Sequence, residues 1–385
     1  MPNFPQGETD VMTAEAAVAA GKKLSGAREL AVDVEADAMH AFHARLCYVQ
    51  VGTDEDIYLF DTLAEGVTTA PLEPLFSDPT RTKYFHAAGG DLQYLAEAGV
   101  RVKGLFDTHR AATLLGWAKV GLADLARELL QVELPKEHQQ SDFSVRPLPA
   151  EVHKYIANDV RYLSEIGRQV REASRKADIL EEVELDCLRM TDEAAERPDL
   201  AELRPKLPRG SLSPTQYVLA QALGKELHLR RLQWAEKANV PMGRMMSNAA
   251  ISAIATRPPT NLKDLARAQG IRGAVVREHG EEILALIREL TDKAKNGQLP
   301  REESADRAPR DPLRKKREDA LRTFRQAKAA ERKVTPSVVL TNPLMDELAK
   351  APPKSLEELE RLPYFGEKRV RLYGAEILDV VSKVS

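Results

Sequence analysis

The chain has 385 residues, of which 43% are apolar and 30% are charged. This length predicts two or three domains, and this apolar fraction excludes a wholly disordered chain. The two cysteines are too few for a disulfide framework or a four-cysteine zinc site. The sequence has neither a secretory signal nor an apolar run long enough to span a membrane, so we expect a cytoplasmic protein.

The net charge of −3 conceals opposite charges on the two halves of the chain. Residues 1–204 contain 22 basic and 36 acidic residues, a balance of −14, whereas residues 205–385 contain 34 basic and 23 acidic residues, a balance of +11. An acidic region can hold cations, and a basic region can hold a polyanion. This pairing favours a nucleic-acid partner over charges that merely cover solvated helices.

The first half has the pattern of an α/β domain. Runs rich in β-branched and aromatic residues, separated by turn residues, predict five strands: LAVDVE, RLCYVQVG, DIYLFDT, KYFHA and GLFDT. The spacing in DLQYLAEAG predicts a helix between the last two strands, and the chain becomes mostly helical after the fifth. We therefore expect a mixed sheet flanked by helices, in a domain over residues 1–175.

Four carboxylates and one phenol in this domain are candidates for a metal site. Asp33 and Glu35 lie two residues apart on the first predicted strand, so both side chains project from one face of the sheet. Asp91 opens a predicted helix, and Tyr155 and Asp159 are spaced to share one face of a later helix. Each alone has an ordinary structural explanation, such as a helix cap for Asp91. Together they offer the oxygen ligands that two Mg²⁺ or Mn²⁺ ions need to cleave a phosphodiester.

The segments that carry these residues resemble the three exonuclease motifs of the DEDD superfamily, and the tyrosine in YIAND is typical of its DEDDy subgroup. Further stretches within residues 15–170 resemble the ribonuclease D family: FHAAGGD, FDT before AATLLGW, GLADLARELL and SDFSVRPL. The resemblance implies a ribonuclease-H-like fold and a 3′-5′ exoribonuclease that trims structured RNAs such as transfer RNA precursors. It also implies the roles of the site residues, with Tyr155 orienting the attacking water and two divalent metal ions bound by Asp33, Glu35, Asp91 and Asp159.

Four further residues bear on substrate binding. Val34 stands where the ribonuclease D family often has threonine, and Phe143 stands where it commonly has tryptophan, which could shift substrate preference but leaves the acids intact. His86 and Arg146 are candidate substrate-binding residues. The alternatives are a structural histidine at the end of a strand and an ordinary surface arginine.

The basic half contains an internal repeat with an offset of 94 residues. The offset superposes MSN at 246–248 on LTN at 340–342, Pro258-Pro259 on Pro352-Pro353, and Gly280 on Gly374. Matches at this many positions predict two copies of one small all-α domain, the first copy over residues 213–290 and the second copy over residues 312–385. We expect a connecting helix and linker at 176–212 and a linker at 291–311, where the sequence is polar and lacks periodicity.

Both copies resemble the HRDC domain, which implies nucleic-acid binding; a packing or protein-binding role is the alternative. A run of basic residues in the second copy gives independent support, because such a run attracts phosphate without reading sequence. Its members are Arg314, Lys315, Lys316, Arg317, Arg322, Arg325, Lys328, Arg332 and Lys333.

The sequence thus predicts a metal-dependent 3′-5′ exoribonuclease with two helical accessory domains. The same four acids would serve a 3′-5′ DNA exonuclease of the same superfamily equally well. A third possibility is a catalytically silent protein that binds nucleic acid. The retention of all four acids and the tyrosine argues against this last alternative.

Overall fold

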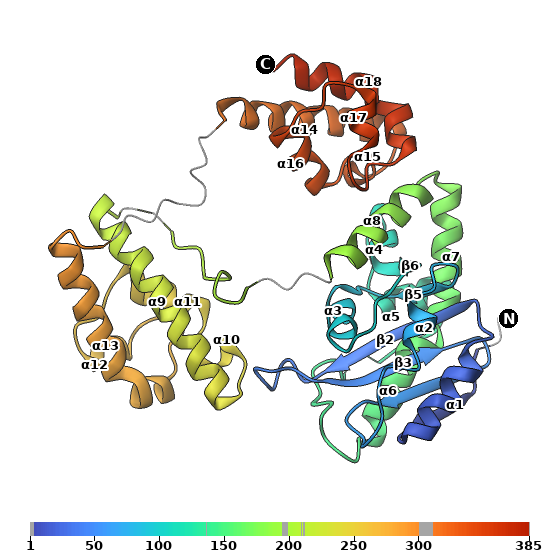
Figure 1. The fold of residues 1–385 in the computed structure, drawn as a ribbon, viewed down its shortest axis with the longest axis horizontal. Helices are drawn as coiled ribbons and strands as arrows, with labels where there is room; N and C mark the ends of the chain where they lie inside the picture. Colours follow the sequence, from blue (N-terminus) through green and yellow to red (C-terminus); the bar gives the residue numbers. More distant parts are fainter. Residues whose placement is uncertain are drawn as a thin grey trace. The chain divides into compact units, whose positions relative to one another are not determined.

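The computed structural model describes residues 4–135, 137–194, 199–208, 210, 212–299 and 311–384. The chain divides into two compact units (Figure 1). The first unit comprises Met1–Ala36, Leu46–Glu196 and Arg310–Ser385, and the second comprises Asp37–Arg45 and Arg197–Pro309. Each unit has its own hydrophobic core.

A mixed six-stranded sheet lies at the centre of the first unit, with the strand order β1-β4-β3-β2-β5-β6. The three central strands β2, β3 and β4 form an antiparallel meander, while β1, β5 and β6 pair in parallel with their neighbours. The strands are β1 (Gly7–Val11), β2 (Glu29–Ala36), β3 (Leu46–Gly52), β4 (Asp56–Asp61), β5 (Thr82–Phe85) and β6 (Leu105–Asp107). The predicted α/β domain with a mixed sheet is confirmed, and β1 is an additional strand that the sequence analysis missed.

Helices flank this sheet, and the longest ones follow the last strand. Helices α6 and α7 cover the sheet face that carries Ala31. A Cβ at Gly52 would contact both Val160 of α6 and Ala31, and a Cβ at Gly167 of α7 would overlap the Tyr84 ring. The helices are α1 (Ala14–Leu24), α2 (Glu73–Phe76), α3 (Gly89–Glu97), α4 (Thr108–Leu114), α5 (Leu122–Leu125), the π-helical turn η1 (Ala126–Leu130), α6 (Ala150–Arg161), α7 (Leu163–Lys176) and α8 (Leu180–Glu193).

Helix α8 lies in the segment that the sequence predicted as a connecting helix and linker. Its Val183 and Cys187 are buried in the same core as the sheet. This helix is therefore an integral part of the α/β body, and it also provides the surface on which the second copy packs.

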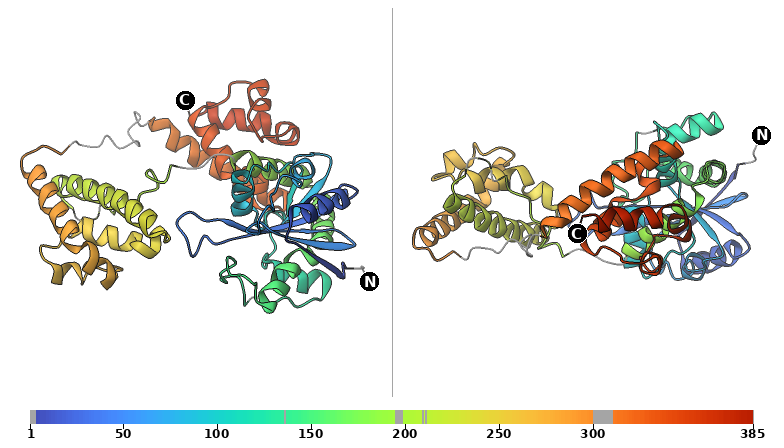
Figure 2. Two further views of the ribbon diagram at one scale, coloured as in Figure 1. Left: turned by 60° about the horizontal axis from the view of Figure 1, so that its bottom comes forward. Right: turned by 90° about the horizontal axis from the view of Figure 1, so that it is seen from above.

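The second copy belongs to the first unit and consists of α14 (Pro312–Arg332), α15 (Pro336–Val339), α16 (Asn342–Lys350), α17 (Leu356–Glu360) and α18 (Glu367–Ser382). Its Val338 is buried in the core of the α/β body. The views in Figures 1 and 2 agree in placing these red helices beside the green helix α8.

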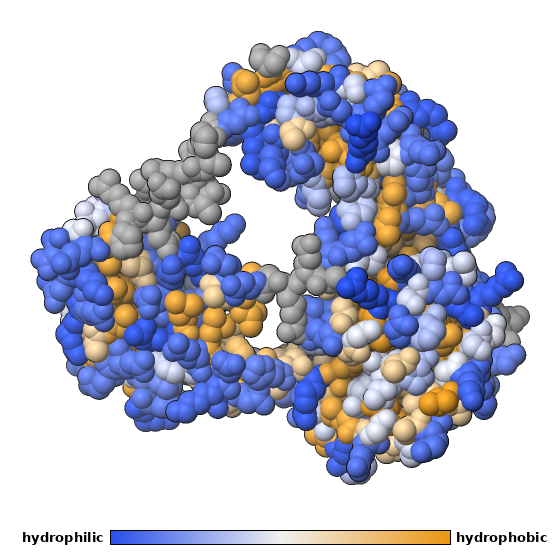
Figure 3. Space-filling model, viewed as in Figure 1, coloured by the Kyte–Doolittle hydropathy of each residue, from blue (hydrophilic) through white to orange (hydrophobic). Residues whose placement is uncertain are grey.

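The first copy forms the second unit and has the same sequence of helices: α9 (Pro214–Ala238), α10 (Met242–Met245), α11 (Asn248–Thr256), α12 (Leu262–Leu265) and α13 (Gly273–Lys295). Helix α13 continues through residues 291–295, the first part of the segment predicted as a linker. Hydrophilic residues cover most of the visible surface of both copies (Figure 3). Within the described residues, no helix combines the length and apolarity needed to cross a bilayer.

Candidate active site

Strand β2 presents two acids at the centre of the sheet. Val32 and Val34 alternate with Asp33 and Glu35, and both valines are buried in the core. The period of two in a strand places the valines on one face and the carboxylates on the other. The carboxylates share their face with Ala31, which is the face that α6 covers, so the two acids point toward that helix.

Helix α6 brings Tyr155 and Asp159 to the same place. The Tyr155 ring is buried, and its hydroxyl donates a hydrogen bond to the Asp159 carboxylate. Carboxylate oxygens of Asp33, Glu35 and Asp159 lie within 4.8 Å of one another. Residues more than 120 positions apart in the sequence thus meet in one half-buried cluster.

Asp91 approaches this cluster from α3. The N-cap position of α3 is Ala88, and Asp91 lies in the first turn, so Asp91 is not the helix cap that its position in the sequence suggested as an alternative. Its carboxylate interacts electrostatically with those of Asp33 and Asp159. The structure therefore brings all four predicted acids and the tyrosine together.

Burial and mutual repulsion make this cluster costly to ionise. Burial raises the pKa of Asp33 to about 7. It raises the pKa of Glu35 to about 10, with a further contribution from the charges of Asp33, Asp159 and Asp91. The same causes raise the pKa of Asp91 and of Asp159 well above the usual carboxyl value. A divalent cation would remove this repulsion, because it stabilises the ionised form of every carboxylate around it.

The residues present fit such a cation. The Oδ2 atom of Asp159 is buried and has no hydrogen-bond partner among the described residues. A buried carboxylate oxygen without a donor is rare unless an ion or water satisfies it. Hard divalent cations prefer carboxylate ligands, so the cluster is suited to a divalent metal ion.

The turn before α3 depends on Asp107, which sequence analysis noted only as part of the FDT motif. The fully buried Asp107 carboxylate accepts hydrogen bonds from the backbone amides of Ala87 (3.3 Å), Ala88 (2.7 Å) and Arg110 (2.8 Å). Ala87 has a φ of 62°, in the left-handed region that non-glycine residues rarely adopt. Asp107 thus caps α4 and at the same time holds the turn that leads to Asp91. An acid at the junction of a strand and a helix was the available signal.

His86 lies in this turn and is neutral. The Thr108 hydroxyl donates its proton to the Phe85 carbonyl, so His86 Nδ1 must donate to Thr108 Oγ1, 2.9 Å away. This leaves Nε2 as an acceptor. Burial and the neighbouring His109 lower the pKa of His86 to about 4. Its role in substrate binding stays a prediction.

Arg146 is committed to contacts within the chain. Its guanidinium forms a bidentate ion pair with Asp61 (2.6 and 2.7 Å), donates to the carbonyl of Phe143, and lies 4.3 Å from the centre of the Tyr48 ring. Substrate binding by Arg146 stays a prediction that these contacts argue against. Phe143 is buried beside this network, and Val34 faces away from the acids, so both departures from the family pattern serve packing.

Comparison with known proteins assigns the same kind of function to the segments that form this site. A 3′-5′ exonuclease family model matches residues 9–173, and an HRDC domain model matches residues 220–287 and 314–381. Ribonuclease D of Gluconacetobacter diazotrophicus is 31% identical over 358 residues, which are 91% of this chain and 88% of that protein.

Solved structures show the same architecture. The catalytic core of RRP6 from Trypanosoma brucei is 26% identical, with a TM-score of 0.61, and the match covers 74% of this chain and 80% of that one. The structure of RNase D from Escherichia coli has a TM-score of 0.70 over 98% of this chain and 99% of that one, and at 20% identity it shows the shared fold alone. Taken with the acid cluster, the extent of these matches shows that the chain belongs to the ribonuclease D family and is a 3′-5′ exoribonuclease.

Proposed function

We propose that Asp33, Glu35, Asp91 and Asp159 hold two divalent ions and that the site hydrolyses the 3′-terminal phosphodiester of structured RNAs such as transfer RNA precursors. The observation that carries this proposal is the convergence of three carboxylates within 4.8 Å around an unpartnered oxygen of Asp159. When bound, two such ions stabilise the attacking and the leaving oxygen of an in-line displacement. A bond forms between the water oxygen and phosphorus, the bond from phosphorus to the 3′ oxygen breaks, and a nucleoside 5′-monophosphate leaves.

Tyr155 orients the attacking water. Burial, together with the neighbouring charges of Asp159 and Glu35, raises the pKa of Tyr155, so the phenol stays protonated at neutral pH. A protonated phenol cannot act as a strong base, but its oxygen can accept a hydrogen bond from water while its proton is donated to Asp159. The hydroxyl therefore fixes where the water stands, and a carboxylate of the cluster takes the proton.

Two features of the chain support an RNA end as the substrate. The neutral His86 beside α3 offers Nε2 as an acceptor, which suits a ribose hydroxyl of the terminal nucleotide. The chain is also 31% identical, over 91% of its length, to a protein described as ribonuclease D. We also propose the domain limits predicted from the sequence, with a catalytic domain over residues 1–175, to whose core the connecting helix α8 adds, and the two copies over 213–290 and 312–385.

The test compares a transfer RNA precursor with a 3′ trailer, an unstructured RNA of equal length and the matching DNA, each labelled at the 5′ end. We expect a ladder of 3′-shortened products from both RNAs, a stop near the mature end of the precursor, and slow or absent degradation of DNA. Equal rates on DNA would replace the RNA assignment with a DNA exonuclease. Degradation that ignores RNA structure would remove the transfer RNA assignment but leave the hydrolytic site in place.

A further inference from the structure

The two copies are built alike, so their surfaces can be compared residue by residue at the offset of 94. In the first copy, Arg231 donates to the Met246 carbonyl (3.1 Å) and to Asn248 Oδ1 (2.7 Å). In the second copy, Arg325 makes the same two contacts, with Leu340 (3.2 Å) and Asn342 (2.9 Å). Because the two copies share these contacts, the surface charges at equivalent positions can be compared directly.

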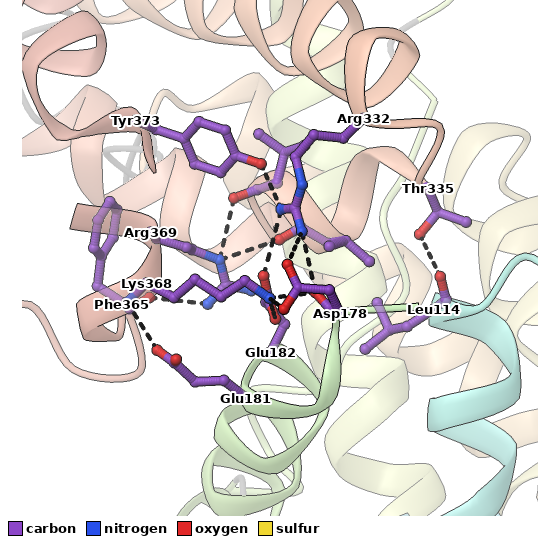
Figure 4. Close-up of polar contacts among 12 residues, drawn as sticks. Leu114, Asp178, Glu181, Glu182, Arg332, Thr335, Phe365, Lys368, Arg369 and Tyr373 are labelled. Atoms are coloured by element: carbon purple, nitrogen blue, oxygen red, sulfur yellow. Dashed lines mark hydrogen bonds and ion pairs between the residues drawn. The ribbon is translucent and has the colours of Figure 1, made fainter. Parts of the chain in front are cut away.

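The second copy uses its charges to dock on the α/β body. Lys368 of α18 donates to the carboxylates of Asp178 (3.0 Å) and Glu182 (3.1 Å), and Arg332 pairs with the same two acids (Figure 4). Glu182 is 1% exposed and Lys368 is 6% exposed. The Thr335 hydroxyl also donates to the Leu114 carbonyl of α4 (3.0 Å). The pairs with the buried Glu182 hold the second copy against α8.

Most members of the basic run of the second copy also have partners within the chain, and these contacts argue against its predicted use in attracting phosphate. Six of its nine members contact acids or backbone carbonyls of the same unit. They are Arg314 with Glu318 and Asp346, Arg317 with Asp311 and the Ala349 carbonyl, Arg322 with Asp319, Arg325 with the Leu340 carbonyl, Lys328 with Glu331 and Glu376, and Arg332 with Asp178 and Glu182.

The first copy has the opposite charge on the matching segment. Residues 248–272, which contain α11 and α12, carry four basic residues and one acidic residue, a balance of +3. The equivalent residues 342–366 carry three basic and five acidic residues, a balance of −2. Where the first copy has Ser252 and Ala253, the second has Asp346 and Glu347.

The basic residues of the first copy are also available. Arg257 and Arg267 are exposed and line a cleft of about 840 Å³ between α11 and α12. Neither arginine makes an ion pair or a side-chain hydrogen bond with the residues that the structure describes. Asp264, the one acid of the segment, accepts a hydrogen bond from Asn261. The small side chains of the cleft leave room for a backbone to lie against the two guanidinium groups.

We propose that the cleft between α11 and α12 of the first copy binds the phosphate backbone of the RNA substrate, and that the second copy serves as a docked brace of the catalytic body. This inference rests on the proposed function for its choice of RNA as the ligand. Guanidinium groups pair with phosphates in bidentate geometry, and small side chains permit close approach without reading bases. The two copies therefore share a fold but have different roles: the first binds RNA, and the second braces the catalytic body.

The test is a pair of charge-matched double variants of the full chain. Arg257→Glu with Arg267→Glu alters the cleft, and Lys350→Glu with Arg361→Glu makes the same change in net charge on the equivalent face of the second copy. All four residues are exposed, so both variants should fold like the parent protein. Binding of a folded RNA is measured by fluorescence anisotropy over a range of salt concentrations, in an Asp33→Asn background that prevents cleavage.

We expect the cleft variant to bind at least about tenfold more weakly and to lose about 2 from the slope of log Kd against log salt, which is the loss of two phosphate contacts. The control should change both values little. Equal weakening in the two variants, or no change in the cleft variant, would overturn the inference. Hydrolysis of a very short oligoribonucleotide by the protein with an intact Asp33 tests the proposed function separately, because such a substrate fills only the catalytic site.

Discussion

The carboxylates of the active site oppose folding when no metal is bound. Burial raises the pKa of Asp33 from 3.8 to about 7, so the folded state favours its protonated form. A carboxyl group whose pKa is raised on folding stabilises the fold below its unfolded pKa, and that contribution is lost as the pH rises through the folded pKa. The metal-free protein should therefore lose stability between about pH 4 and about pH 7.

The variant Asp33→Asn tests two effects of the Asp33 charge: it destabilises the metal-free protein, and it supports metal binding and turnover. Without metal and at about pH 8, we expect the variant to melt several degrees above the parent protein, because asparagine cannot ionise, and this difference should vanish toward about pH 4. Added Mg²⁺ should stabilise the parent protein more than the variant. The turnover of the variant should fall by about 10³-fold or more. A variant that melts below the metal-free parent at every pH would contradict the account.

Tyr155→Phe tests the single hydroxyl that lies beside the acids. The ring is buried and its packing is preserved in phenylalanine, whereas the hydrogen bond to Asp159 is lost. If the hydroxyl orients the attacking water, the single-turnover rate should fall by about 10²–10⁴-fold, the range of a positioned proton-handling group. Calorimetric titration with Mn²⁺ should show nearly unchanged metal affinity. An unchanged rate, or loss of metal binding, would show that the hydroxyl has a different role.

At the scale of the elements, side-chain periodicity predicted which residues share one face of a strand or helix. The alternation along β2 and the spacing along α6 placed Asp33, Glu35, Tyr155 and Asp159 correctly, because each element has a fixed side-chain period. Strand β1 escaped detection since GETDV is a short edge strand with one buried residue and no alternating apolar face. The supporting role of Asp107 depends on amides from another segment, and the docking of α8 depends on partners more than 130 residues away. Only the cap that Asp107 forms on α4 has a local signal, an acid at the junction of a strand and a helix, whereas these long-range contacts leave none.

The turn held by Asp107 gives a prediction at this scale. In Asp107→Asn one of the two acceptor oxygens is replaced by an NH₂ group, so either the Ala88 amide or the amides of Ala87 and Arg110 lose their acceptor. The turn should relax and displace Asp91, and the affinity for Mn²⁺ should fall by about 10–100-fold, as for other residues that orient metal ligands. Ser247→Ala is the control, because it removes the side-chain cap of α11 in the other unit. It should lower stability by about 1 kcal/mol and leave metal affinity unchanged. Similar metal affinities in the two variants would contradict the positioning role.

At the scale of the whole molecule, the second copy and the catalytic body form one unit through a buried charge cluster. Glu182→Gln leaves Lys368 and Arg332 without their buried partner, which costs about 3 kcal/mol. Hydrogen exchange of α8 and α18 amides should accelerate by about 10²-fold. Glu331→Gln, which removes an exposed partner of Lys328, is the matched control and should change exchange by less than about fivefold. If both variants exchange alike, the second copy is not held by this cluster.

The most direct test of the central claim is a nuclease assay on RNA labelled at the 3′-terminal nucleotide, run with Mg²⁺, with a chelator, and with Asp33→Asn. A metal-dependent 3′-5′ exoribonuclease should release the label at once as a mononucleotide in Mg²⁺, release none in chelator, and regain full activity when the metal is restored. The Asp33→Asn protein should release almost none at any Mg²⁺ concentration. Release of the label within longer fragments, or undiminished release in chelator or by Asp33→Asn, would contradict the assignment of the chemistry to this cluster.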